Sequence, residues 1–145
     1  MIIDDDLGLG HVHGDPFNQK LPGLPGRSPD ILVVLHSHHA RVRENYLDGP
    51  ADLVVEVLSP STAGVDRGEK FREYAAGGVP EYWIVDPQRQ VAEFYRLAVD
   101  SRYQRVSAGG DGRYACASVP GFWIREEWLW SRPPVRDVET ALGLR

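Results

Sequence analysis

The chain has 145 residues, of which 42% are hydrophobic and four are tryptophans, and this fits one compact domain over residues 1–145 with a core of its own. Its formal net charge of −5 argues against a broadly basic, non-specific nucleic-acid binder, although a local basic cleft is compatible with it. The single cysteine, Cys116, excludes an internal disulfide and a multi-cysteine zinc site, and we expect it to be a buried side chain in a reducing compartment. No apolar run reaches the ~18 residues of a membrane span, and the first six residues are acidic where a signal peptide is basic. We therefore expect a soluble, cytoplasmic protein.

The opening of the chain, through Gly26, is rich in glycine and proline. Residues 1–26 are predicted to form an extended arm or a hairpin, with short strands near 10–13 and 17–21. The core is predicted over residues 27–130 and a surface tail over 131–145. Within the core, the β-branched segment 30–35 indicates a strand. The polar connection that follows, residues 36–50, is expected to hold a short helix around 41–46.

The middle of the chain changes from strand to helix and back. Phe71, Tyr74, Ala75 and Gly78 recur at the spacing of one helix face, which predicts an amphipathic helix over 63–76 that ends at Gly77-Gly78. A hairpin follows, and three more short strands complete the chain. These strands are expected at residues 81–85, 91–97, 103–106, 113–117 and 122–124. The pattern predicts an α/β (α+β) domain whose mixed central sheet has the helix on one side.

The most informative stretch is an apolar run with one acidic residue inside it. Glu56 is the only charged residue between Leu53 and Leu58. Apolar neighbours on both faces predict a strand that is buried on both sides. A buried carboxylate without a partner is strongly unfavourable or takes up a proton, so we expect a metal ion, a cation or strong hydrogen-bond donors beside Glu56.

A partner for Glu56 follows from pairing the first two central strands antiparallel. If Asp30 lies opposite Glu56, then Val34 lies opposite Asp52, because paired positions keep a constant sum. Directly opposite Cβ atoms lie ~4.5–5.5 Å apart, so Asp30 and Glu56 are predicted to share one divalent cation. Asp52 lies ~13 Å along the strand and is interpreted as a cap or backbone acceptor, with a supporting role as the alternative. Oxygen ligands of this kind suit Mg²⁺ or Mn²⁺.

Lys70 is the predicted third member of the site. The chain has two lysines, and Lys70 lies at the border of the buried face of the predicted helix, within reach of the end of the sheet. An ammonium group there can orient a water molecule or offset negative charge in a transition state. Asp66, one helical turn earlier, is expected to hold Lys70 in place.

Purely structural interpretations stay open for these residues. Asp30 follows a proline and is typical of a strand start, and Glu56 can pair with an arginine. Lys70 can pair with Glu73 or Asp66 as an ordinary solvated helix charge.

A group of histidines offers a rival metal site. His36, His38 and His39, together with His11 and His13, can bind zinc or another transition metal. No cysteine lies near them in the sequence, and the segment that carries three of them is predicted to be a polar loop. A histidine-based metal hydrolase is therefore retained as a separate hypothesis.

Three blocks of the sequence resemble the Uma-two family of endonucleases. They are residues 52–61 (DLVVEVLSPS), then Asp66 and Lys70 with Tyr74, and residues 78–87 (GVPEYWIVDP). That family belongs to the restriction-endonuclease-like, PD-(D/E)XK superfamily, and the similarity covers about residues 7–130. The resemblance implies a restriction-endonuclease-like mixed sheet with a flanking helix and additional β-hairpins.

The resemblance also implies roles for individual residues. In the superfamily, an Asp at the start of one strand and an acidic residue in the next bind Mg²⁺, which corresponds to Asp30 and Glu56. The usual lysine two residues further on is Leu58 here, and the family implies that Lys70 on the following helix replaces it. Members usually begin with several dozen more residues, including a helix, so we expect this chain to be short at its N-terminus. The missing helix would weaken catalysis or promote a homodimer.

These observations predict an endonuclease that hydrolyses DNA phosphodiester bonds with Mg²⁺ or Mn²⁺. Asp30 and Glu56 would bind the metal, and Lys70 would position the attacking water or stabilise the transition state. Arg67 and Arg72 would contact flanking phosphates. The alternative, from a different class, is a catalytically silent domain that binds nucleic acid or a protein partner.

Overall fold

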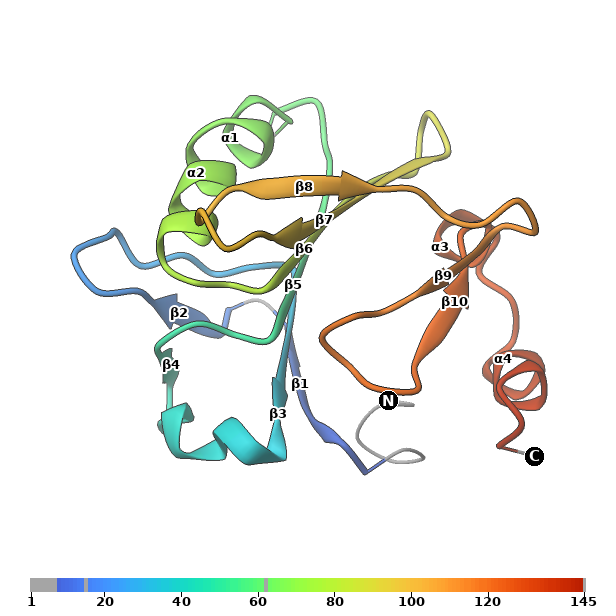
Figure 1. Ribbon diagram of the computed structural model, residues 1–145, viewed down its shortest axis with the longest axis horizontal. Helices are drawn as coiled ribbons and strands as arrows, with labels where there is room; N and C mark the ends of the chain where they lie inside the picture. Colours follow the sequence, from blue (N-terminus) through green and yellow to red (C-terminus); the bar gives the residue numbers. More distant parts are fainter. Residues whose placement is uncertain (1–7, 15, 62, 145) are drawn as a thin grey trace.

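The structure, a computed structural model, describes residues 8–14, 16–61 and 63–144, apart from the side chains of Ala63 and Asp66. Its centre is a mixed sheet of six strands in the order β1-β3-β5-β6-β7-β8 (Figure 1). These strands are β1 (Gly10–Gly14), β3 (Ile31–Leu35), β5 (Leu53–Val57), β6 (Glu81–Asp86), β7 (Val91–Leu97) and β8 (Tyr103–Val106). All neighbours pair antiparallel except β5 and β6. The expected mixed central sheet is therefore present.

The parallel pair β5–β6 needs a long connection, since parallel strands start at the same edge of the sheet. Two short helices supply it, α1 (Ala63–Arg67) and α2 (Glu69–Ala76), and they cover one face of the sheet (Figure 1). Smaller elements complete the fold. They are β2 (Asn18–Lys20) paired parallel with β4 (Tyr46–Asp48), β9 (Arg113–Ala115) paired antiparallel with β10 (Trp123–Arg125), α3 (Trp128–Ser131) and α4 (Val135–Ala141).

Strand β5 is buried on both faces because each face of the sheet has its own apolar cluster. Val54 packs on the α2 side with Tyr74 and Tyr82. Val55 packs on the other side with Trp83, under β9 and β10. The near-continuous apolar sequence of β5 thus reflects two cores, as predicted.

The register of β3 and β5 is the predicted one. Ile31 pairs with Val55, and Val33 pairs with Leu53. Both pairs give the constant sum that places Asp30 opposite Glu56. This pairing fixes the candidate site at the end of the sheet where β5 finishes.

The predicted single helix over 63–76 is divided at Gly68. This residue has φ −107° and ψ −94°, outside the helical region, and α2 begins at the next residue. A Cβ at Gly68 would lie 2.7 Å from the carbonyl oxygen of Gly64, one turn earlier, so glycine permits the close backbone contact at this break. The predicted end of the helix is confirmed, because Gly77 is the C-cap and Gly78 has φ +88°.

The N-terminal segment was expected to be an extended arm or a hairpin, and its described residues do not form a hairpin. Strand β1 pairs with β3 at the edge of the main sheet, and β2 leaves the sheet to pair with β4. Val12 of β1 packs against the core on the β9–β10 side, which explains why β1 joins the sheet. The helix expected around 41–46 is also misplaced: a 3₁₀ helix occupies His36–Arg41, and β4 begins at Tyr46 because Leu47 is fully buried.

The tail past residue 130 contains structure that the sequence reading did not predict. Helix α4 begins after Pro134, and Glu139 on this helix is buried. Across the described residues, none of the helices has the length and apolar character needed to cross a membrane.

Candidate functional site

Glu56 is the buried centre of the candidate site. Its side chain is 1% exposed and lies on the α2 side of β5. One oxygen, Oε1, accepts the backbone N–H of Asp30 at 2.8 Å. The other, Oε2, forms an ion pair with the Lys70 ammonium at 2.8 Å and accepts a hydrogen bond from the Tyr74 hydroxyl at 3.0 Å. The expected donors and cation beside this carboxylate are therefore present.

Asp30 meets Glu56 across the end of the β3–β5 pair. The backbone N–H of Val57 donates to Asp30 Oδ2 at 2.7 Å, while the Asp30 N–H donates to Glu56. In this reciprocal pair, each carboxyl group accepts a hydrogen bond from the backbone of the opposite strand, so both side chains lie at the same end of the β3–β5 pair. Asp30 is exposed and Glu56 is buried, so the pair runs from solvent into the sheet.

Lys70 and Tyr74 reach Glu56 from α2. They are four residues apart and therefore lie one above the other on the same helix face. The Lys70 side chain is 16% exposed, which places its ammonium at the boundary between solvent and core, as predicted. The predicted contact of Lys70 with Asp66 lies outside the described residues, because the Asp66 side chain is not described.

Asp52 lies at the other end of β5 and does not join this group. Its Oδ2 accepts the backbone N–H of Leu35 at 2.8 Å, and its Oδ1 lies 2.7 Å from His38 Nδ1. The interpretation of Asp52 as a backbone acceptor is confirmed. It fixes the far end of the β3–β5 pair.

Arg67 reaches the same face of the sheet from α1. Its Nη2 and Nε atoms lie 2.7 and 3.1 Å from Oε2 of Glu93 on β7, and the Arg67 side chain is 43% exposed. Hydrogen bonding to Glu93 raises the pKa of Arg67. Glu93 Oε1 also accepts the Tyr95 hydroxyl at 2.9 Å, and burial raises the pKa of Tyr95 to about 12. Sequence reasoning missed Glu93.

The signal for Glu93 was the register of the second hairpin. Glu93 pairs with Ile84, which in turn pairs with Glu56. Paired residues point to the same face, so the two glutamates lie two strands apart on the α1–α2 side.

Arg72 does not lie at the site. Two residues along a helix are about 200° apart around its axis, so Arg72 projects away from the Lys70 face of α2. It lines a cavity of about 410 Å³ with Phe71, Arg102 and Tyr103 at the start of β8.

The histidines come close together without forming a ligand set. The ring of His11 lies 5.0 Å from that of His36 and 5.2 Å from that of His39, between centroids. His38 is instead bound to Asp52. Within residues 8–14, 16–61 and 63–144, no three His, Cys, Asp or Glu side chains are arranged to hold a metal ion. The histidine-based metal site thus has no support from the geometry.

The donor set at Asp30 and Glu56 fits a hard divalent cation. Both side chains offer oxygen atoms only, and Mg²⁺ typically uses one or two carboxylates while keeping several waters. Asp30 is exposed, with Oδ1 pointing to no donor among the described residues, so it offers an open ligand position. A cation would have to share Glu56 with Lys70.

A second buried carboxylate lies on the opposite face of the sheet. Glu81 accepts hydrogen bonds from Trp83 Nε1 at 2.8 Å, from the Tyr114 hydroxyl, and from both the backbone N–H and the hydroxyl of Ser118 at 2.9 Å. The Cys116 thiol donates to it at 3.4 Å, and burial raises the pKa of this thiol to about 12. Sequence reasoning missed Glu81. Its donors come from β6, β9 and the loop after β9, so it fastens β9 to the sheet.

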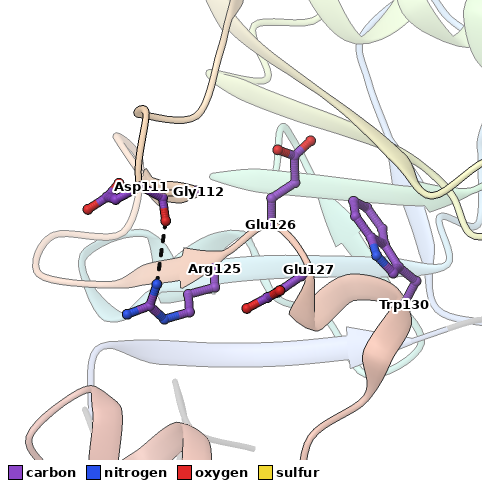
Figure 2. Close-up of a pocket in the computed structure, with 6 residues that line it drawn as sticks. All are labelled: Asp111, Gly112, Arg125, Glu126, Glu127 and Trp130. Carbon is purple, nitrogen blue, oxygen red and sulfur yellow. Dashed lines mark hydrogen bonds between the residues drawn. The ribbon is translucent and has the colours of Figure 1, made fainter.

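Another cavity, of about 210 Å³, lies beside β9, β10 and α3 (Figure 2). It is lined by Asp111, Gly112, Arg125, Glu126, Glu127 and Trp130. Arg125 turns back to the Asp111 carbonyl oxygen at 3.4 Å. This acidic cavity lies on the sheet face opposite α1 and α2, so it is separate from the Glu56 site (Figure 1).

Comparison with known proteins identifies a family and a fold to which the chain is similar. The model of the family Uma2, described as "Putative restriction endonuclease", matches residues 4–127. A crystal structure described as a putative nuclease belonging to DUF820 from Anabaena variabilis matches with a TM-score of 0.71 and 17% identity. The match covers 90% of this chain and 74% of that one. No curated protein matches.

Proposed function

The chain belongs to the Uma2 family of putative restriction endonucleases, and we propose that it is a divalent-metal-dependent endonuclease that hydrolyses DNA phosphodiester bonds. The observation that carries the proposal is the meeting of Asp30, Glu56 and Lys70 at one end of the sheet. Two carboxylates and an ammonium group at the same end of the sheet offer what phosphodiester hydrolysis requires, namely cation ligands and a positive charge for the phosphate.

Asp30 and Glu56 would hold Mg²⁺ or Mn²⁺. The bound ion would lower the pKa of a water molecule and neutralise charge on the scissile phosphate. Lys70, which now neutralises Glu56, would turn its ammonium to the attacking water or to the phosphate oxygens. Tyr74 would keep Glu56 in place through its hydroxyl, and Arg67 would contact a flanking phosphate.

Arg72 and Asp52 have smaller parts in this proposal. Arg72 faces another cavity, so we assign it no phosphate at the cleavage site. Asp52 supports the site indirectly, by fixing the opposite end of the strands that carry Asp30 and Glu56.

The test is nicking of supercoiled plasmid DNA with Mg²⁺ or Mn²⁺. We expect the intact protein to nick the plasmid, Glu56→Ala to lose at least about 100-fold in rate, and Lys70→Met to lose about 10- to 100-fold, as for the removal of one charge-stabilising group. Glu44→Ala, at an exposed acidic position, is the matched control and should cleave normally. Equal cleavage by the intact protein and Glu56→Ala would contradict the assigned site.

One observation favours a second candidate, a catalytically silent binding domain. Both oxygens of Glu56 already have donors inside the protein, so the hydrogen-bonding needs of this buried carboxylate are met without a metal ion. Calorimetric titration with Mn²⁺ separates the two candidates: the nuclease binds the ion and Glu56→Ala does not, whereas the silent domain binds DNA without binding the ion. A homodimer stays a prediction, testable by light scattering of the full chain.

A further inference from the structure

The α1–α2 side of the sheet carries two neighbouring cross-strand rows. The first row runs from Glu56 on β5 through Ile84 on β6 to Glu93 on β7. In the next row, Tyr95 on β7 pairs with Arg105 on β8. The Tyr95 hydroxyl donates to Glu93, so the two rows are joined at β7.

Three cationic side chains lie along these rows, at increasing distance from the Glu56 carboxylate. Lys70 lies on Glu56, Arg67 lies on Glu93, and Arg105 belongs to the edge strand β8. Neighbouring strands are ~4.8 Å apart, so β5 and β8 are separated by about 14 Å. A B-form strand places a phosphate every ~3.4 Å along its axis, and this length therefore spans about four phosphates.

Two of these cations retain capacity for an anion. Arg67 directs Nε and Nη2 to the same oxygen of Glu93, and its half-exposed guanidinium keeps Nη1 for another acceptor. Arg105 is exposed, and among the described residues its side chain makes no hydrogen bond or ion pair. Because Glu56 and Glu93 already balance Lys70 and Arg67, Arg105 adds a net positive charge at the edge of the sheet.

We propose that the backbone of the nucleic-acid substrate runs from the Glu56 site over Arg67 to Arg105 and leaves the protein across β8. This inference rests on the proposed nuclease function and adds the path and direction of the substrate strand. Arg105 then acts as a phosphate contact several nucleotides from the reacting bond. It contributes to DNA affinity and leaves the chemistry of the site unchanged.

The test measures affinity for a fluorescent DNA duplex by anisotropy at several salt concentrations, in Ca²⁺ and in EDTA. Each lost phosphate contact reduces the magnitude of the negative slope of log K against log salt by ~0.9. We expect Arg105→Ala to lower it by about 0.9 and the double variant with Arg67→Gln by about 1.8, with affinity at least about tenfold weaker for the double variant. Arg136→Ala, at an exposed position on α4, is the matched control and should bind as the intact protein does.

The Arg105→Ala substitution should not disturb folding, because it leaves no partner unpaired among the described residues, so a change in DNA affinity can be assigned to the lost contact. An unchanged slope and affinity in Arg105→Ala, or an equal loss in Arg136→Ala, would overturn the inference. So would failure of the intact protein to bind the duplex in either buffer. If the Arg105 variant loses affinity while the intact protein cleaves no plasmid, the path is supported and only the nuclease proposal fails.

Discussion

Glu56 is a carboxylate that folding removes from water and places beside three donors of the described part of the chain, namely the Asp30 N–H, the Tyr74 hydroxyl and the Lys70 ammonium. Removing two opposite charges from water is so unfavourable that a buried ion pair adds little net stability, although breaking the pair leaves a costly unpaired charge. Apolar residues in place of both Glu56 and Lys70 would suit the surrounding core of Val54, Tyr82 and Ile84 at least as well. The Glu56–Lys70 pair is therefore better explained by chemistry at the site than by stability.

Removing the Tyr74 hydroxyl measures how much its hydrogen bond to the buried Glu56 carboxylate contributes to stability. Hydrogen bonds to charged acceptors contribute about 1.5–3 kcal/mol, so Tyr74→Phe should lower the free energy of unfolding by that amount. Urea denaturation at pH 7 measures it. Tyr46→Phe is the control, because the Tyr46 hydroxyl has no hydrogen bond within the described residues, and equal losses in the two variants would contradict the assignment.

At the scale of elements, the break between α1 and α2 decides which side chains meet the sheet. Arg67 ends α1 and contacts β7, while Lys70 lies in the first turn of α2 and contacts β5. Gly68 between them takes a conformation outside the helical region. The break thus sends two cations, three residues apart in the chain, to different strands.

Two glycines of this segment give opposite predictions. Gly68→Ala places a Cβ 2.7 Å from the Gly64 carbonyl oxygen and should destabilise the protein by about 1–3 kcal/mol. Gly64→Ala has open space around the new Cβ within α1 and should stabilise it by about 0.5–1 kcal/mol. Thermal unfolding of both variants checks this pair. Stabilisation by Gly68→Ala would show that the break is not required.

The strands could be predicted from the sequence because successive residues of a strand point to opposite faces of the sheet, so burial gives the apolar residues a regular spacing. The bounds of β7 and β8 followed from the sequence pattern, and the opposition of Asp30 to Glu56, which was assumed as a self-consistent register, is the one that the strands adopt. The break at Gly68 was not predictable, because it depends on the local backbone conformation and on the contact with the Gly64 carbonyl. Glu93 was missed for a related reason. Predicting where a strand lies does not show how it pairs with its neighbours, and that pairing decides which acidic residues share a face with Glu56.

At the scale of the whole molecule, the helices are held to the N-terminal segment by an ion pair. Arg27 donates to both oxygens of Glu73 on α2, at 2.8 and 3.0 Å, and to Glu69 at 3.2 Å. These contacts connect the chain before β3 to the helix that carries Lys70. The position of the ammonium group therefore depends on contacts far from the site.

This ion pair predicts a pH dependence of stability. Hydrogen bonding to Arg27 lowers the pKa of Glu73 below its ordinary value of 4.5. A lowered folded-state pKa gives stability that is complete above the unfolded value and is lost as pH falls through the folded value. The difference in unfolding free energy between the intact protein and Glu73→Gln should be constant near neutral pH and shrink below about pH 4.5. A difference that grows in acid, or one shared by Glu44→Gln, would contradict the pairing.

The central claim is that the end of the sheet at Asp30 and Glu56 is a divalent-metal site. Anomalous diffraction from crystals soaked in Mn²⁺ tests it most directly. The account predicts one strong peak within about 2.1 Å of a carboxylate oxygen of Asp30 and of Glu56, absent in Glu56→Ala. A peak at the rings of His11, His36 and His39, or no peak between the two carboxylates, would contradict it.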